Sequence, residues 1–180
     1  MAQDLVYFDL ETRRTAADVG GWGNKEKMGI SVAVTFSTRL NEYRIYTEEE
    51  SPLLIDQLLK ADLVIGFNQV NFDYGVLMAH TILDLREQIR SLDLLIDLEK
   101  KLGHRLSLDA VATATLGGLS KTADGLDAIR WWQQGKIMEI AEYCCYDVKV
   151  TKCVHEFGRQ NGYVRYLDRT RREQKVDVNW

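Results

Sequence analysis

Hydrophobic positions in the first third of the chain follow the two-residue rhythm of β-strands. Residues 5–11 form a short, mostly apolar and β-prone segment, which is typical of a strand near the middle of a sheet. Residues 30–36 show β-branched alternation, and residues 42–46 come after a short polar turn. This pattern predicts a central first strand and an antiparallel hairpin made of the second and third strands.

A helical pattern then leads into a second buried strand. Ser51 and Pro52 are typical of a helix start, with Ser51 as the N-cap, and leucines continue the pattern to residue 59. Residues 63–67 are again short and apolar. Because a strand, a helix and a strand in this order form a crossover connection, we expect residues 63–67 to run parallel to another strand. The predicted sheet is therefore mixed.

The second half of the chain is mainly helical in pattern until residue 162. The two-residue rhythm then returns and predicts a β-hairpin over residues 163–180, with strands at 163–167 and 176–180. No repeat or linker divides the chain, so we expect one α/β domain over residues 1–180, a mixed sheet flanked by α-helices. The helices predicted in this half span residues 72–81, 94–102, 108–115, 126–134 and 136–160.

Composition limits the class of protein. Hydrophobic residues make up 46% of the chain and charged residues 28%, which is typical of a soluble protein. No apolar run approaches the ~20 residues of a membrane span, and the amino terminus lacks a secretion signal. The three cysteines form neither a disulfide framework nor a zinc-site spacing. We therefore expect a cytoplasmic protein without a membrane partner.

Charge is distributed unevenly along the chain. The net charge is −4, but residues 152–180 carry seven basic and four acidic side chains, a net +3, which leaves −7 on the remainder. A protein that holds divalent cations in an acidic centre and phosphates on a basic edge would show this asymmetry. A solvated charged tail, or a hairpin that only completes the domain, accounts for it as well.

Asp9 and Glu11 form the first group of candidate functional residues. Side chains two apart on a strand leave the same face of the sheet, here near the carboxyl end of the first strand. Acids beside apolar Phe8 and Leu10 are costly to bury unless a cation or solvent lies between them. Acids occupy 27 of 180 positions, however, so such a pair also arises by chance.

Asp73 follows the second buried strand across a turn that contains Gly66 and Asn68. Active sites of α/β sheets lie beyond the carboxyl ends of the strands, and this turn would place Asp73 there, beside Asp9. The alternative is that Asp73 only interacts favourably with the amino terminus of the next helix.

Tyr143 and Asp147 form the third group. Residues four apart on a helix share one face, so these two side chains are expected to project together, while Cys144 and Tyr146 point elsewhere. An amphipathic helix with a surface acid and a half-buried tyrosine would have the same sequence pattern.

Taken in order, these motifs resemble the DEDD superfamily of 3′-to-5′ exonucleases. The order is residues 8–12, then residues 66–68 with 72–73, then Tyr143 with Asp147. Glu142 stands where the histidine branch has histidine, so the resemblance is to the tyrosine (DEDDy) branch. Over residues 5–160 the chain is most similar to polymerase-B-like and YprB-type ribonuclease-H-like exonuclease domains, and residues 91–93 and 106–121 share in this similarity.

The resemblance implies a site for two divalent cations, Mg²⁺ or Mn²⁺. In this site Asp9 bridges the two ions, and Glu11 and Asp147 complete the site of the ion that activates water. Asp73 helps to hold the second ion through water, and Tyr143 orients the attacking water. Oxygen ligands suit these hard cations.

The resemblance also implies the substrate. Leu10, Thr12, Asn68 and Phe72 are the expected substrate-binding residues. The expected reaction removes nucleoside 5′-monophosphates from the 3′ end of single-stranded nucleic acid, with DNA slightly favoured over RNA. A helicase or another DNA repair protein is the expected partner.

Two other functions stay open on the sequence. One is a catalytically silent ribonuclease-H-like module that binds nucleic acid and associates with a helicase. The other is a ribonuclease-H-like endonuclease or resolvase, which uses clustered acids without the Tyr143 and Asp147 helix. Trp22, in a glycine-rich loop, either stacks on a terminal base or covers the edge of the core.

Overall fold

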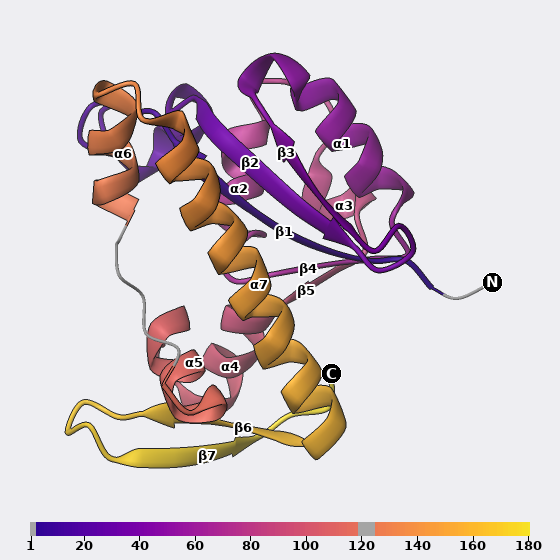
Figure 1. Ribbon diagram of the computed structural model, residues 1–180, viewed down its shortest axis with the longest axis vertical. Coiled ribbons are helices and arrows are strands. Elements are labelled where there is room, and N and C mark those ends of the chain that lie inside the picture. Colours follow the sequence, from indigo (N-terminus) through magenta and orange to yellow (C-terminus); the bar gives the residue numbers. More distant parts are fainter. Residues whose placement is uncertain (1–2, 119–124) are drawn as a thin grey trace.

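The computed structural model describes residues 3–118 and 125–180, which fold around a five-stranded sheet of order β3-β2-β1-β4-β5 (Figure 1). Strands β1 to β3 are antiparallel neighbours, whereas β4 and β5 run parallel to β1. The predicted mixed α/β sheet is therefore confirmed. The strands are β1 (Leu5–Thr12), β2 (Ile30–Ser37), β3 (Glu42–Tyr46), β4 (Leu63–Gly66) and β5 (Ser91–Asp93).

Two hydrophobic cores lie on the two faces of the sheet, because side chains along β1 alternate. Val6 and Phe8 belong to one core and Tyr7 to the other. Helices α1 (Ser51–Lys60), α2 (Asp73–Leu77) and α3 (Leu85–Gln88) contribute to the core that contains Phe8. The other helices contribute to the core that contains Tyr7: α4 (Leu94–Leu102), α5 (Leu108–Leu116), α6 (Gly125–Gln133) and α7 (Ile137–Asn161).

The long helix α7 crosses the sheet over β1 and β2 (Figure 1). Near its carboxyl end the buried His155 Nδ1 forms a 2.9 Å hydrogen bond with the hydroxyl of Tyr7 on β1. Helix α7 ends at Asn161 and is capped by Gly162, whose φ of 75° lies in the left-handed region that favours glycine. The predicted helix over residues 136–160 is thus displaced by a single residue at each end.

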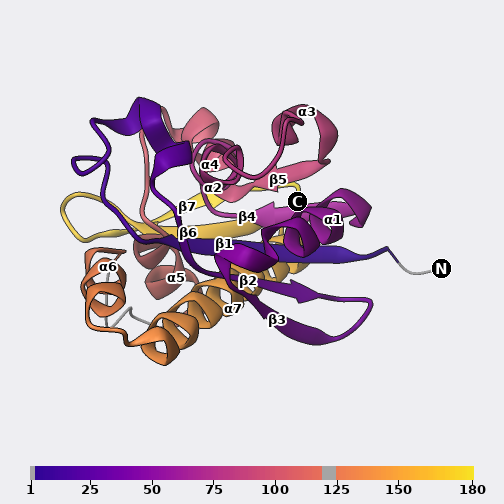
Figure 2. The ribbon, with the colours of Figure 1, turned by 90° about the horizontal axis from the view of Figure 1, so that it is seen from above.

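A two-stranded antiparallel hairpin follows α7, as predicted. It consists of β6 (Tyr163–Leu167) and β7 (Glu173–Asp177), and Figure 2 shows it from above. The second strand begins three residues earlier than the pattern of residues 176–180 suggested. The register explains the difference, because Tyr163 pairs with Asp177 and Leu167 with Glu173.

Other boundaries also differ from the predictions. Ser51 is the first residue of α1 rather than its N-cap, because the short 3-10 helix η2 (Glu48–Glu50) precedes it. The helix predicted over residues 72–81 ends at Leu77, and β5 was not predicted. The loop after β1 contains the 3-10 helix η1 (Trp22–Lys27). Residues 119–121 of the similar stretch lie outside the described residues.

Within residues 3–118 and 125–180, no helix has both the length and the apolar character needed to span a membrane.

Candidate functional site

Three carboxylates from β1 and α7 meet on one side of the sheet. Asp9 and Glu11 lie on the β1 face that also carries Tyr7, and Asp147 projects from α7. One carboxylate oxygen of each lies within 4.8 Å of the others. Glu11 and Asp147 are buried, and Asp9 is half-buried. Three convergent carboxylates supply the oxygen ligands that Mg²⁺ and Mn²⁺ prefer.

Tyr143 lies one helical turn before Asp147 and is largely buried. Its phenol donates a hydrogen bond to the Asp147 carboxylate. Its ring packs edge to face with that of Trp131 on α6, with 6.1 Å between the ring centroids. Burial, together with the negative charges of Asp147 and Glu11, raises the pKa of Tyr143 well above its ordinary value. The phenol is therefore a permanent hydrogen-bond donor at neutral pH.

Cys144 also faces the cluster, so the prediction that it points elsewhere is wrong. Its Sγ lies 3.4 Å from both the carbonyl oxygen and Oδ2 of Asp9. Residues three apart on a helix are neighbours as well, which brings Cys144 to the side of Asp147. Burial and the charge of Asp9 raise the pKa of the Cys144 thiol well above its ordinary value. Cys144 thus donates a hydrogen bond as a protonated thiol.

Asp73, the fourth predicted carboxylate, binds to the backbone of β1. Its Oδ1 accepts a 3.0 Å hydrogen bond from the amide of Leu10. Strand β4 pairs with β1 only as far as Tyr7. The Leu10 amide therefore lies beyond the end of β4, and the Asp73 carboxylate accepts its hydrogen bond instead. Burial and the adjacent charge of Asp9 raise the pKa of Asp73 well above its ordinary value. A cation among these acids would relieve that repulsion.

The turn between β4 and α2 is fixed by Asp93. Its carboxylate accepts hydrogen bonds from the amides of Asn68 and Val70 and also caps α4. Asn68 has a left-handed φ of 77°. Gly66 allows the turn to approach β1, because a Cβ there would lie 2.7 Å from Gln69 Oε1 and 3.0 Å from the carbonyl oxygen of Phe8. No pattern in the sequence predicted this role of Asp93.

The four predicted substrate-binding residues lie in different surroundings. The side chain of Leu10 is buried in the core on the opposite face of the sheet, so it does not face the cluster. Thr12 is buried and donates a 3.0 Å hydrogen bond to the carbonyl oxygen of Arg14. Asn68 Oδ1 accepts a 3.0 Å hydrogen bond from Arg105 Nη2. The Phe72 ring packs edge to face with that of Trp22, with 6.1 Å between the ring centroids.

An apolar groove of about 640 Å³ begins at Glu11. Trp22 and Phe72 line it together with Leu126 and Ile129 of α6. Trp22 is 66% exposed and therefore does not cover the core. The groove is large enough for one nucleoside and lies directly beside the carboxylates.

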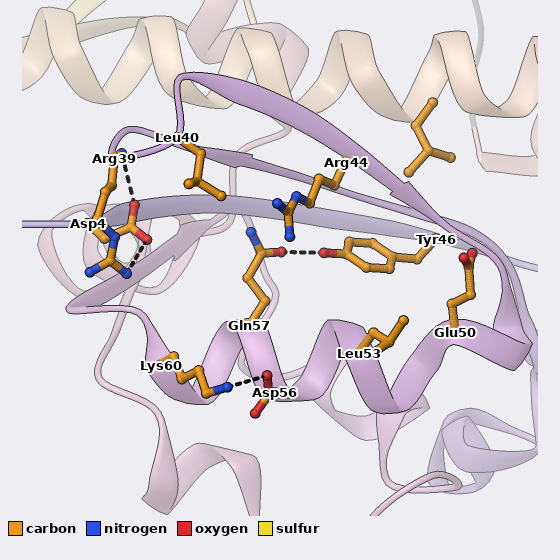
Figure 3. A pocket seen from close by; sticks show the side chains of 11 residues that line it. Asp4, Arg39, Leu40, Arg44, Tyr46, Glu50, Leu53, Asp56, Gln57 and Lys60 are labelled. Atoms are coloured by element: carbon orange, nitrogen blue, oxygen red, sulfur yellow. Dashed lines mark hydrogen bonds and ion pairs between the residues drawn. The ribbon is translucent and has the colours of Figure 1, made fainter.

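A second groove, of about 600 Å³, lies between β3 and α1 and includes none of the candidate residues (Figure 3). Its charged side chains are paired among themselves or with direct neighbours. Arg39 binds Asp4 at 2.9 Å, and Lys60 binds Asp56 at 2.6 Å. The fixed charges of this groove are thus already balanced.

Adding Mn²⁺ or Mg²⁺ to the metal-free protein should raise its melting temperature. A cation that binds only the folded protein at about 100 times its Kd adds about 2.7 kcal/mol of stability, which is about 5 to 10 °C for a chain of this size. Differential scanning fluorimetry measures the shift. Glu11→Gln should reduce it, whereas Glu26→Gln, a change at an acid outside the cluster, should not. No shift with either ion would contradict a metal site here.

Comparisons with known proteins agree with this fold. A model of the RNase_H superfamily, RNase_H_2, matches residues 6–157. The structure is similar to that of the family B DNA polymerase from the hyperthermophilic archaeon Pyrobaculum calidifontis, with a TM-score of 0.61 and 14% sequence identity. The match covers 87% of this chain but 24% of the polymerase chain. A search of curated proteins found no match.

Proposed function

Because the chain belongs to the RNase H superfamily, we propose that it is a metal-dependent 3′-to-5′ exonuclease that acts on single-stranded nucleic acid. The observation that carries the proposal is the meeting of Asp9, Glu11 and Asp147, with Tyr143 one turn before Asp147. The similarity to the polymerase supports the fold alone, and this chain spans about a quarter of that protein. The products would be nucleoside 5′-monophosphates.

The carboxylates have distinct proposed roles. Asp9, Glu11 and Asp147 would hold one divalent cation. Asp9 would share a second with Asp73, whose pKa the charge of Asp9 raises. When bound, the two cations would stabilise negative charge on the attacking and leaving oxygens of the phosphodiester. The hydrogen bond from Cys144 to Asp9 and that from Leu10 to Asp73 fix two of these carboxylates before substrate arrives.

Tyr143 would position the attacking water. Because its pKa is raised, the phenol stays protonated at neutral pH and is not available as a base. Its O–H is donated to Asp147, so its oxygen would accept a hydrogen bond from the water. Trp131 packs against the ring and limits its movement. The water therefore would lose its proton without help from the phenol, and Tyr143 would contribute orientation.

The groove at Glu11 would receive the terminal nucleoside. Exposed Trp22 and the adjacent Phe72 offer aromatic surfaces for a base, a sequence-tolerant contact of about 1 to 3 kcal/mol. Thr12 and Asn68 lie at the carboxyl ends of β1 and β4, and Thr12 also lines the groove. These positions support their proposed role in substrate binding.

The test uses a single DNA strand labelled at its 5′ end and incubated with Mn²⁺. The proposed activity would produce a ladder that shortens from the 3′ end. Internal cuts at early times would indicate an endonuclease instead, and no cleavage would favour a silent binding module. Matched DNA and RNA strands would then test the proposed preference for DNA. Co-purification would test the proposed helicase or repair partner.

Tyr143→Phe should lower turnover about 10- to 100-fold, because the ring stays in place while the water-orienting hydroxyl is lost. Metal binding should change little, since the carboxylates are intact. Single-turnover hydrolysis measures the first effect, and metal-induced thermal stabilisation measures the second. Tyr163→Phe removes a hydroxyl outside the cluster and should leave turnover unchanged. Full turnover by Tyr143→Phe would exclude the proposed role.

A further inference from the structure

Three arginines gather at the turn between β6 and β7. Arg169, Arg171 and Arg172 are all exposed there. The acid of this turn, Asp168, accepts hydrogen bonds from the Thr170 amide and hydroxyl, the Arg172 amide and the Gln174 side chain. These bonds lower the pKa of Asp168 to about 2. Its carboxylate therefore holds the shape of the turn, which we call the arginine tip (residues 168–172).

The guanidinium groups at the arginine tip are available for a partner. The nearby acids are already paired, because Glu173 binds Arg165 at 3.1 Å and Asp177 lies 3.5 Å from Lys175. Within the described part of the chain, no ion pair involves Arg169, Arg171 or Arg172. Three unpaired arginines on a shaped turn form an anion-binding surface.

The hairpin is held firmly against the body of the protein. Thr115 on α5 donates a 2.8 Å hydrogen bond to the carbonyl oxygen of Arg165 and accepts one of 3.0 Å from its amide. Val164 and Val176 are buried in the core that contains Tyr7. The two strands that carry the arginine tip are thus anchored to the body of the protein.

A series of contacts connects the hairpin to the carboxylate site. Arg105 is exposed and donates a hydrogen bond to Asn68, and its neighbour His104 contacts Tyr166 of β6 at 6.2 Å. In both ribbon views the arginine tip lies on the same side of the molecule as α6 and the loop that follows β1 (Figures 1 and 2). Basic groups therefore mark both ends of a path from the arginine tip to the turn beside Asp73.

We propose that the arginine tip and Arg105 bind the phosphate backbone of the single strand whose 3′ end occupies the carboxylate site. The proposal rests on the proposed function and extends it to the strand upstream of the cleaved bond. Guanidinium groups bind phosphates with paired N–H donors, and such contacts do not depend on base sequence. The chain would hold a long substrate at two separate places.

The test compares two variants with the same change in charge. The tip variant carries Arg169→Ala, Arg171→Asn and Arg172→Ala, with asparagine at residue 171 because φ is 59° there. The control variant carries Arg44→Ala, Lys60→Ala and Arg86→Ala, exposed positions whose ion pairs lie around β3, α1 and α3. Figure 3 shows Arg44 and Lys60. Thermal melting should show that both are folded.

Binding of a thymidine strand of about 20 nucleotides is measured by fluorescence anisotropy in EDTA, at several salt concentrations. Each phosphate contact to a single strand adds about 0.7 to the slope of log K against log salt. The tip variant should therefore lose about 2 from this slope and bind about 10- to 100-fold more weakly at about 0.1 M salt. The control variant should lose much less, and hydrolysis of a tetranucleotide by the tip variant should equal that of the wild type.

Equal affinity and slope for the wild type and the tip variant would overturn the proposal, as would equal losses in the control variant. Absence of binding by the wild type, or an equally large loss on the tetranucleotide, would overturn it too. Because binding is measured in EDTA, it does not depend on catalysis. Tip-dependent binding without trimming in Mn²⁺ would refute the proposed exonuclease while retaining the phosphate-binding surface.

Discussion

Asp9→Asn protein should be folded but should lose nuclease activity by about a thousand-fold or more. Asp9 lies in the carboxylate cluster and beside Asp73, and its neutral amide would bind a divalent cation poorly. Cation stabilisation of the transition state is worth several kcal/mol, and each 1.36 kcal/mol is tenfold in rate. Initial rates on an end-labelled strand in Mn²⁺ measure the loss.

The matched control is Asp56→Asn on α1. Asp56 is an exposed acid paired with Lys60, far from the cluster in sequence and on the other face of the sheet. Its replacement should leave the rate within about twofold of wild type, because exposed ion pairs contribute little. If Asp9→Asn protein, purified free of host nuclease, kept the wild-type rate, the proposed cluster would not be the active site.

Asp93→Ala should produce the largest loss of stability among these variants, about 3 kcal/mol. Its carboxylate accepts four backbone hydrogen bonds, from Asn68, Val70, Leu95 and Ile96. Loss of a helix cap costs about 0.5 to 2 kcal/mol, and unsatisfied buried donors add about 1 to 3 kcal/mol. Denaturant unfolding measures the change, and the nuclease rate should fall because the turn before Asp73 loosens.

Asp84→Ala is the control for helix capping. Asp84 also caps a helix, α3, but it is half-buried, and within the described part of the chain its carboxylate bonds only to Arg86. Its replacement should cost about 1 kcal/mol or less. Similar losses in the two variants would mean that Asp93 serves as an ordinary cap and does not support the turn between β4 and α2.

Strong periodic patterns in the sequence were sufficient to predict most of the fold. Strand β3 and helix α4 begin and end where the pattern predicted, and α7 is displaced by one residue. Strand β5 was missed because three residues are too few to show a period. Helix α2 is shorter than predicted, and His80, beyond its end, lies 3.6 Å from Glu48. Tertiary contacts of this kind are not encoded in local spacing.

The candidate site was only partly predictable. The placement of Asp9 and Glu11 on one face follows from alternation along a strand, and that of Tyr143 with Asp147 follows from helical spacing. Cys144 was predicted to point elsewhere because it is not four residues from Asp147, but residues three apart on a helix are also neighbours. The bond from Leu10 to Asp73 depends on where β4 ends, which no pattern within either segment specifies.

Gly162 alone separates α7 from β6, and this short connection would make the protein a molecular ruler. Asp147 lies on α7 and the arginine tip on the hairpin, so rigid elements set the span between them. A strand longer than this span would be held at both ends of the path. Once the strand is trimmed to less than this span, it would be held at one end of the path only and would dissociate faster. The length at which trimming slows would then be a property of the protein, independent of the nucleotide sequence.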